Sequence, residues 1–67
     1  MQLTIAQVNE CLKIKGENFR KCRERKNYSI EKMVQLTGLS RMTIIRMERG
    51  NHDYRIISEI RYSRAIY

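Results

Sequence analysis

The chain has 67 residues, a length that fits one small domain and leaves little interior for a catalytic pocket. Its 14 Lys and Arg against 7 Asp and Glu give a formal net charge of +7, which favours a polyanionic partner, DNA or RNA before a membrane surface. No apolar run approaches the ~20 residues of a membrane span, and no secretory signal pattern opens the chain, so we expect a cytoplasmic protein that has no contact with a membrane.

Metal and catalytic chemistry have few candidate residues. Cys11 and Cys22, with His52 as the single histidine, are too few for a disulfide framework or a four-ligand zinc site. Both cysteines fall where a helix would face inward, so we expect small buried hydrophobic residues. The chain offers no paired carboxylates for a pocket and no nucleophile beside a base, which argues against an enzyme. We therefore predict no metal and no cofactor.

The first elements in chain order are two helices. Thr4 with Gln7 three residues later is a capping-box pattern, and it predicts a helix over about 5–14. Gly16 offers a stop or a bend, and a second helix is predicted over about 17–26. The two helices could instead fuse across Gly16. The inward residues of the first helix would be Ile5, Val8, Cys11 and Leu12, and those of the second Phe19 and Cys22.

Two short helices and a tight turn come next. Ser29 is a suitable N-cap for a helix over 30–37, with Met33 and Val34 buried and Leu36 as a further candidate. Gly38 ends that helix, Ser40 caps a new one over 41–49, and Gly50 closes it. Two short helices joined by a three- to four-residue turn that contains Gly have the helix-turn-helix geometry.

A last helix is predicted within 55–67, after a loop at 51–54. Its spacing indicates that Ile56 and Ile60 face the core, with Ser63 or Ile66 as the next inward position. Ile57 and Tyr67 lie off that stripe, so we expect them to be exposed.

One face of the helix over 41–49 is predicted to pack on the core, and a buried salt bridge would hold it there. Ile44 and Met47 point inward at helical spacing, and Glu48 sits at the inner edge. Arg23 lies at the edge of the apolar stripe of the second helix, where a charge is costly unless it is paired. We therefore predict a structural salt bridge between Arg23 and Glu48. The alternative is that both side chains are exposed and unpaired.

The opposite face of this helix carries Arg41, Met42, Ile45 and Arg46. Arginine suits a bidentate contact to guanine, and Met42 and Ile45 could press on thymine methyl groups. A merely solvated face would explain the arginines but not the two apolar residues. Some partner must cover them, and that partner could be protein instead of DNA.

The stretch from Glu17 to Gly50 resembles the Cro/C1-type (Xre-like) helix-turn-helix family. The matching features are Phe19, Cys22 and Arg23, then Ser29, then the runs "LTGLS" and "TIIRMERG", and a weaker match continues into the last helix. Two positions depart from the family pattern. Ile30 stands where Gln is common, and Val34 stands where Ala is common.

The resemblance implies an all-α, compact bundle of four to five helices, a lambda-repressor-like helix-turn-helix domain, in a bacterial or phage-encoded transcriptional regulator, most commonly a repressor. Residues 16–67 would form this domain, with the motif at about 29–50, and residues 1–15 an extra helix packed on it. The protein would bind a double-stranded DNA operator as a homodimer, with the helix 41–49 in the major groove. Base contacts would come from Arg41, Met42, Ile45 and Arg46, and phosphate contacts from Ser29, Ile30, Arg49, Asn51, His52 and Arg55.

A second hypothesis belongs to another class of function. The same fold could serve as a protein-interaction module, such as an antitoxin or a modulator of a phage-type repressor, and Ile30, Met42 and Ile45 favour this reading. An RNA-binding role has less support, because the chain has no aromatic stacking platform of the RNA-module kind. The helix from Ile56 to Tyr67 is the first candidate for a dimer surface.

Overall fold

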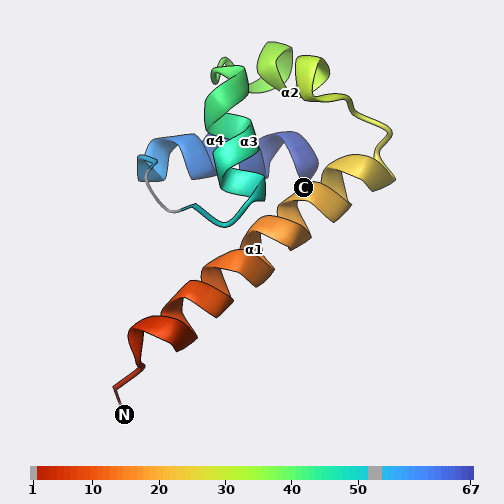
Figure 1. The fold of residues 1–67 in the computed structure, drawn as a ribbon. Helices are drawn as coiled ribbons and strands as arrows, with labels where there is room; N and C mark the ends of the chain where they lie inside the picture. The colour runs from red at the N-terminus through yellow and green to blue at the C-terminus, as the bar shows by residue number, and fades with distance from the viewer. Residues whose placement is uncertain (1, 52–53) are drawn as a thin grey trace.

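The structure is a computed structural model that describes residues 2–51 and 54–67. Within these ranges it contains helices and no strands: α1 (Ile5–Arg25), α2 (Ile30–Thr37), α3 (Arg41–Glu48) and α4 (Ile56–Ile66). The predicted all-α class is confirmed. The long α1 runs diagonally past the three shorter helices, and its N-terminal half projects beyond them (Figure 1). No helix in the described part of the chain is both long enough and apolar enough to span a membrane.

Helix α1 is continuous where the sequence predicted a break. The capping box is present: the Gln7 N–H donates to Thr4 Oγ1 at 3.1 Å, and the Thr4 N–H donates to Gln7 Oε1 at 2.8 Å. The helix then runs through Gly16, so the division into helices over 5–14 and 17–26 is wrong and the fused alternative is correct. A Cβ atom at Gly16 would lie 2.6 Å from both the Met47 carbonyl oxygen and the Gly50 nitrogen. Gly16 therefore serves close helix packing and does not act as a stop.

The α2–turn–α3 segment follows the predicted caps. Ser29 Oγ accepts from the Lys32 N–H at 3.0 Å, and Ser40 Oγ accepts from the Thr43 N–H at 3.1 Å. Gly38 has a φ of +73°, a left-handed conformation that favours glycine. The helix α3 ends at Glu48, one residue before the predicted end, and Arg49 is its C-cap.

A small set of apolar side chains from all four helices and the turn forms the core. The rings of Phe19 on α1 and Tyr62 on α4 have centroids 4.8 Å apart and are tilted by 43°. Tertiary packing of this core holds α2 and α3 in place, since helices of eight residues are marginal alone. The buried apolar residues are Phe19, Met33, Leu39, Ile44, Met47, Tyr62 and Ile66.

The buried face of α4 differs from the predicted one. Ile56 and Ile60 are 75% and 49% exposed, whereas Tyr62 and Ile66 are buried, so the prediction that Ile56 and Ile60 face the core is wrong. The physical reason is that Tyr62 fills more core volume than either isoleucine, and its hydroxyl finds polar partners inside. The predicted exposure of Ile57 and Tyr67 is confirmed.

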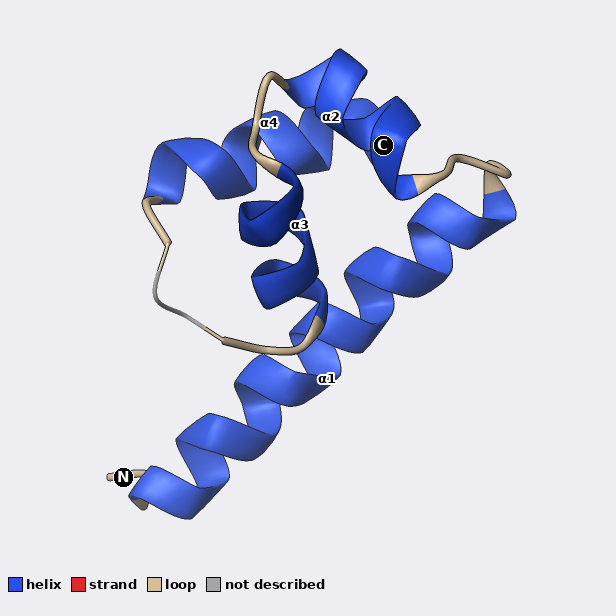
Figure 2. Cartoon of the chain, turned by 45° about the horizontal axis from the view of Figure 1, so that its top comes forward, coloured by secondary structure: helices blue, strands red, loops and turns tan. Residues whose placement is uncertain are grey.

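Four predictions of burial on the other helices need correction. Cys11 is exposed, whereas Cys22 is half-buried against the core. Leu36 is 47% exposed, because it lies on the outer side of α2 while Met33 and Thr37 face inward. Ile5 and Val8, which were expected to face inward and pack residues 1–15 on the domain, are 80% and 40% exposed, because the body of the protein does not reach the first turns of α1. Figure 2 shows the same projection from another side.

Candidate nucleic-acid interface

The inner side of α3 is fixed to the body by packing and by one buried ion pair. Ile44 and Met47 are buried, and the carboxylate of Glu48 accepts from Arg23 at 2.7 Å (Nε to Oε2) and 3.0 Å (Nη2 to Oε1). This is the bidentate Arg–carboxylate geometry, which adds direction as well as strength. The predicted salt bridge between Arg23 and Glu48 is thus present, with side chains only 13% and 7% exposed.

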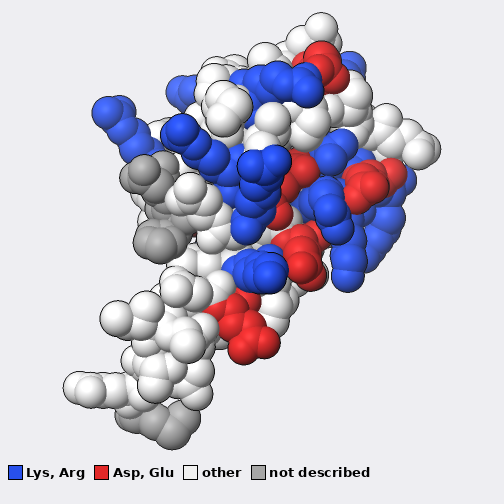
Figure 3. All heavy atoms as spheres, viewed as in Figure 1, with Lys and Arg blue, Asp and Glu red and all other residues white. Residues whose placement is uncertain are grey.

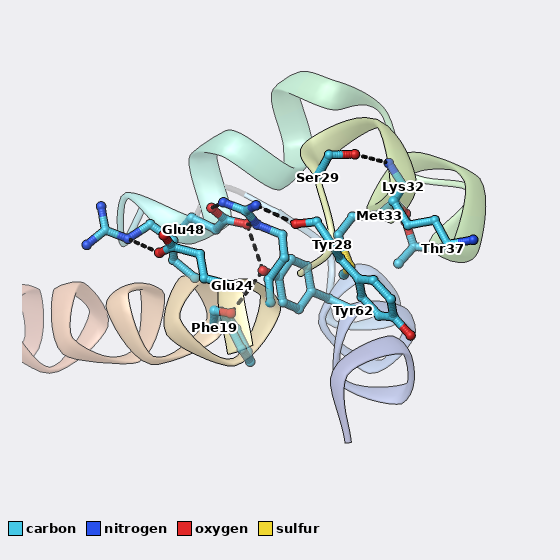
Figure 4. Close-up of polar contacts among 11 residues, drawn as sticks. Phe19, Glu24, Tyr28, Ser29, Lys32, Met33, Thr37, Glu48 and Tyr62 are labelled. Carbon is cyan, nitrogen blue, oxygen red and sulfur yellow. Dashed lines mark hydrogen bonds and ion pairs between the residues drawn. The ribbon is translucent and has the colours of Figure 1, made fainter. Parts of the chain in front are cut away.

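Two further polar groups, one beside Arg23 and one beside Glu48, complete this cluster (Figure 4). Arg23 Nη1 donates to the Tyr28 carbonyl oxygen at 2.8 Å, which also fixes the segment entering α2. The Tyr62 hydroxyl lies 2.7 Å from Glu48 Oε2 and 3.2 Å from the Phe19 carbonyl oxygen. Its single proton goes to the carboxylate, since hydrogen bonds to charged acceptors are the stronger ones.

The electrostatics of this cluster keep both partners of Glu48 protonated. Burial raises the pKa of the Tyr62 phenol above its ordinary value, and the hydrogen bond to Glu48 adds to the rise. The hydrogen bond to Glu48 raises the pKa of Arg23 as well. The cluster connects α1, α3 and α4, so the orientation of α3 does not depend on the short helix itself.

The outer side of α3 carries the predicted base-contacting residues. Arg41, Met42 and Arg46 are exposed, and Ile45 is half-buried. Met42, at 54% exposure, has no cover within the described chain. Arg49, a predicted phosphate contact, is exposed at the C-terminal end of the same helix. These residues form one accessible surface, which we name the α3 outer face (Arg41, Met42, Ile45, Arg46 and Arg49).

Arg41 has an intramolecular partner that sequence reasoning missed. Its guanidinium forms an ion pair with Glu31 in the first turn of α2, and both side chains are more than half exposed. Hydrogen bonding to the backbone N–H of Glu31 itself lowers the pKa of that carboxyl, and the nearby Arg41 lowers it further. Glu31 therefore competes with any anion that approaches Arg41.

A polar cavity opens beside α3, where the chain passes into α4. It has a volume of about 280 Å³ and brings together two of the predicted contacts, Arg46 and Arg55. Arg55 is the N-cap of α4, and its side chain makes no cap hydrogen bond. The remaining lining residues are Thr43, Tyr54 and Ser58, none of which the sequence had indicated. We name this site the α3–α4 cavity.

The other predicted phosphate contacts lie outside this cavity. Ser29 is exposed, but its hydroxyl is occupied as the N-cap of α2. Ile30 is half-buried against the core, and its apolar side chain cannot hydrogen-bond a phosphate, so only its backbone could take part. Asn51 is exposed, and its backbone N–H donates to the Arg46 carbonyl oxygen at 3.0 Å. His52 lies outside the described residues.

Positive charge is distributed unevenly over the molecule. All 14 Lys and Arg residues lie at position 13 or later in the chain. On the face that Figure 3 shows, they cover the globular part around α3, and the projecting end of α1 carries none. Among the described residues, no group of three or more His, Cys, Asp and Glu side chains could hold a metal ion.

Comparison with known proteins gives no relative: no family model, no curated protein and no solved structure matches the chain.

Proposed function

We propose that the chain is a sequence-specific double-stranded DNA-binding protein with a lambda-repressor-like helix-turn-helix fold, and that it acts as a transcriptional regulator, specifically a repressor. In this proposal α3 enters the major groove, and Arg41, Met42, Ile45 and Arg46 contact base edges. The protein acts on its operator as a homodimer.

The α3 outer face is the observation that carries the proposal. Arginines and uncovered apolar side chains share one side of a helix whose other side is fixed by Ile44, Met47 and the Arg23–Glu48 ion pair. Direct readout requires such rigidity, because bidentate contacts to a base tolerate little movement. Contact with solvent alone would account for the arginines on the outer side of α3, but it would not account for the exposed apolar side chain of Met42.

The α3–α4 cavity supports the proposal from a neighbouring site. Arg55 and the hydroxyls of Thr43 and Ser58 line it next to the base-contacting Arg46, and guanidinium and hydroxyl groups bind phosphate oxygens. Its position beside α3 suits contact with the sugar-phosphate backbone at the edge of the groove that α3 enters.

Binding of duplex DNA, measured by fluorescence anisotropy, tests the proposal. Duplexes selected from a random pool supply the operator, and Arg46→Ala is compared with Arg20→Ala. Both substitutions remove one positive charge, but Arg20 belongs to α1 and not to the α3 outer face, and it pairs with Glu24 on its own helix. We expect Arg46→Ala to weaken the selected duplex by about 10- to 100-fold and to reduce the preference over random duplex, from the ~1–3 kcal/mol of one bidentate base contact.

Arg20→Ala should change both affinities little and equally. An equal loss from both substitutions would point to unspecific electrostatic binding and would overturn the proposal. Affinity of the wild type for its selected duplex should also fall steeply as salt rises.

A second candidate function is a protein-interaction module on the same fold. The 54% exposure of Met42, next to the half-buried Ile45, favours it, because an apolar helix face suits a groove on another protein. The same experiment separates the two candidates. Equally weak binding of selected and random duplexes at ~150 mM salt would favour the protein partner over the operator.

A further inference from the structure

The projecting end of α1 has an apolar face without cover. We name residues 5–12 the arm. Gly16 and Phe19, on the same side of α1, are buried against the body, and Leu12, Val8 and Ile5 continue that side by steps of three and four residues. The side chains on this side of α1 become more exposed toward the N-terminus: Leu12 is half-buried, Val8 is 40% exposed and Ile5 is 80% exposed. The face that packs the core therefore extends past the end of the body (Figures 1 and 2).

A second apolar face without cover lies on α4. Ile56, Ile60 and Tyr67 are 75%, 49% and 78% exposed, on a side of α4 that is roughly 120° around the helix from the buried Tyr62 and Ile66. A shallow hollow of about 510 Å³ runs along this side, lined by Glu59, Ile60, Ser63, Arg64 and Tyr67. We name it the α4 groove. It spans nine residues, 59 to 67, which is close to the eight residues of the arm.

We propose that the arm of one chain packs into the α4 groove of a second copy of the same chain, and that the exchange is reciprocal. In a two-fold dimer, contact of the arm with the partner's groove implies the same contact in reverse, so both uncovered faces of each chain are buried at once. No further partner is then needed for either face.

Charge favours this contact over others between two copies. Each chain has a net charge of +7, so surfaces that approach each other should be poor in Lys and Arg. The arm is the part of the chain that meets this condition, since Glu10 is its single charged residue. The α4 groove carries Arg64 and Glu59, and Glu59 is already paired with Lys15. Glu10 lies on the side of α1 away from Ile5, Val8 and Leu12, so the contacting face of the arm carries no charge and adds no repulsion to a surface whose unpaired charge is positive.

The exposed area is sufficient for a specific dimer. A compact monomer of 8.1 kDa exposes about 4,500 Å², whereas this chain exposes 5131 Å². The excess is about 600 Å² per chain, and burial of this excess on both copies gives about 1,200 Å² in total. That value lies at the lower end of specific protein–protein interfaces.

The dimer leaves the α3–α4 cavity accessible. Ser58 lines that cavity, whereas Ile60 lines the α4 groove. Residues that are two positions apart in an α-helix are separated by about 200° around its axis, so Ser58 and Ile60 lie on opposite sides of α4. The inference therefore deepens the homodimer of the proposed function by naming its surface. It concerns the protein without DNA, so its test stands apart from any test of operator binding.

Sedimentation equilibrium of the free protein tests the inference. We expect the wild type to form dimers at micromolar concentration. Val8→Glu and Ile60→Glu should each raise the dissociation constant of the dimer at least about tenfold, because each substitution would bury a charge in an apolar contact. Ile14→Glu is the matched control: Ile14 is 52% exposed but lies on the other side of α1 from Ile5, Val8 and Leu12. It should leave the dissociation constant unchanged. Circular dichroism of each variant checks that the helices are retained.

Cross-linking decides which surfaces meet. In a Cys11→Ser, Cys22→Ser background, chains with Val8→Cys are mixed with chains with Ile60→Cys and treated with a short thiol cross-linker. A covalent dimer that forms in the mixture but in neither protein alone is the expected result. Cross-linking of Val8→Cys with itself would mean that arms pair with arms and would overturn the inference. A wild type that stays monomeric, or equal weakening by Ile14→Glu, would overturn it as well.

Discussion

Removal of the Glu48 carboxylate tests whether one buried cluster holds α3 to the rest of the protein. In Glu48→Ala the guanidinium of Arg23, only 13% exposed, keeps one hydrogen bond to the Tyr28 carbonyl and loses two to Glu48. The Tyr62 hydroxyl loses its charged acceptor and keeps only the more distant Phe19 carbonyl oxygen.

The expected cost follows from this geometry. Breaking a buried ion pair by removing one partner costs about 3–5 kcal/mol, and we take about 3 kcal/mol because Arg23 and Tyr62 each keep one partner. A domain of this length has a free energy of unfolding of roughly 3–10 kcal/mol. The substitution should therefore remove a large part of the stability and lower the Tm by roughly 12–24 °C.

Urea unfolding followed by circular dichroism measures this cost, with two comparison variants. Glu24→Ala removes a carboxylate that pairs with Arg20 on the exposed surface of α1, and it should change the free energy of unfolding by less than about 0.5 kcal/mol. The double variant Arg23→Met, Glu48→Leu replaces the ion pair with apolar side chains and should recover most of the loss. A loss below about 1 kcal/mol in Glu48→Ala, or a double variant as unstable as the single one, would refute this account of the cluster.

Three further predictions concern other sites. Gly16→Ala should lower the free energy of unfolding, measured in urea, by about 1–3 kcal/mol, because the added Cβ would lie 2.6 Å from the Met47 carbonyl oxygen of α3. This clash outweighs the gain in helix propensity from glycine to alanine. A stabilised variant would contradict the close approach of the two helices. Because the folded-state pKa of Tyr62 is raised, the stability that its protonated hydroxyl contributes is fully present below about pH 10 and is lost as the pH rises through the folded-state pKa. In an alkaline absorbance titration, Tyr62→Phe should therefore lose the tyrosine phase that the wild type shows at the highest pH. An unchanged titration profile would count against this assignment. Glu31→Gln should tighten operator binding several-fold by releasing Arg41 and removing a negative charge, with Glu17→Gln as the control; equal effects of the two would argue for net charge alone.

Local signals determined the α2–turn–α3 segment. Ser29 and Ser40 each satisfy an N–H group three residues ahead, and Gly38 adopts a conformation that costs other residues more, so these boundaries depend on neighbours in the chain. The Arg23–Glu48 ion pair could also be predicted from the sequence, because helical periodicity placed both charged residues at the edge of the apolar stripe that faces the core. Each of these features needs only residue type and spacing.

The tertiary structure alone decided the continuity of α1, the buried face of α4 and the membership of the α3–α4 cavity. A glycine in a helical pattern signals a stop and a close approach equally well, and the backbone of Met47 that Gly16 meets lies on another helix. On α4, Ile56 and Tyr62 are both apolar enough to be buried, and the choice between them depends on the volume and the polar partners that α1 and α3 supply. Sequence spacing fixes which residues share a side of one helix, but the side that faces inward is set by groups that only the folded chain brings together.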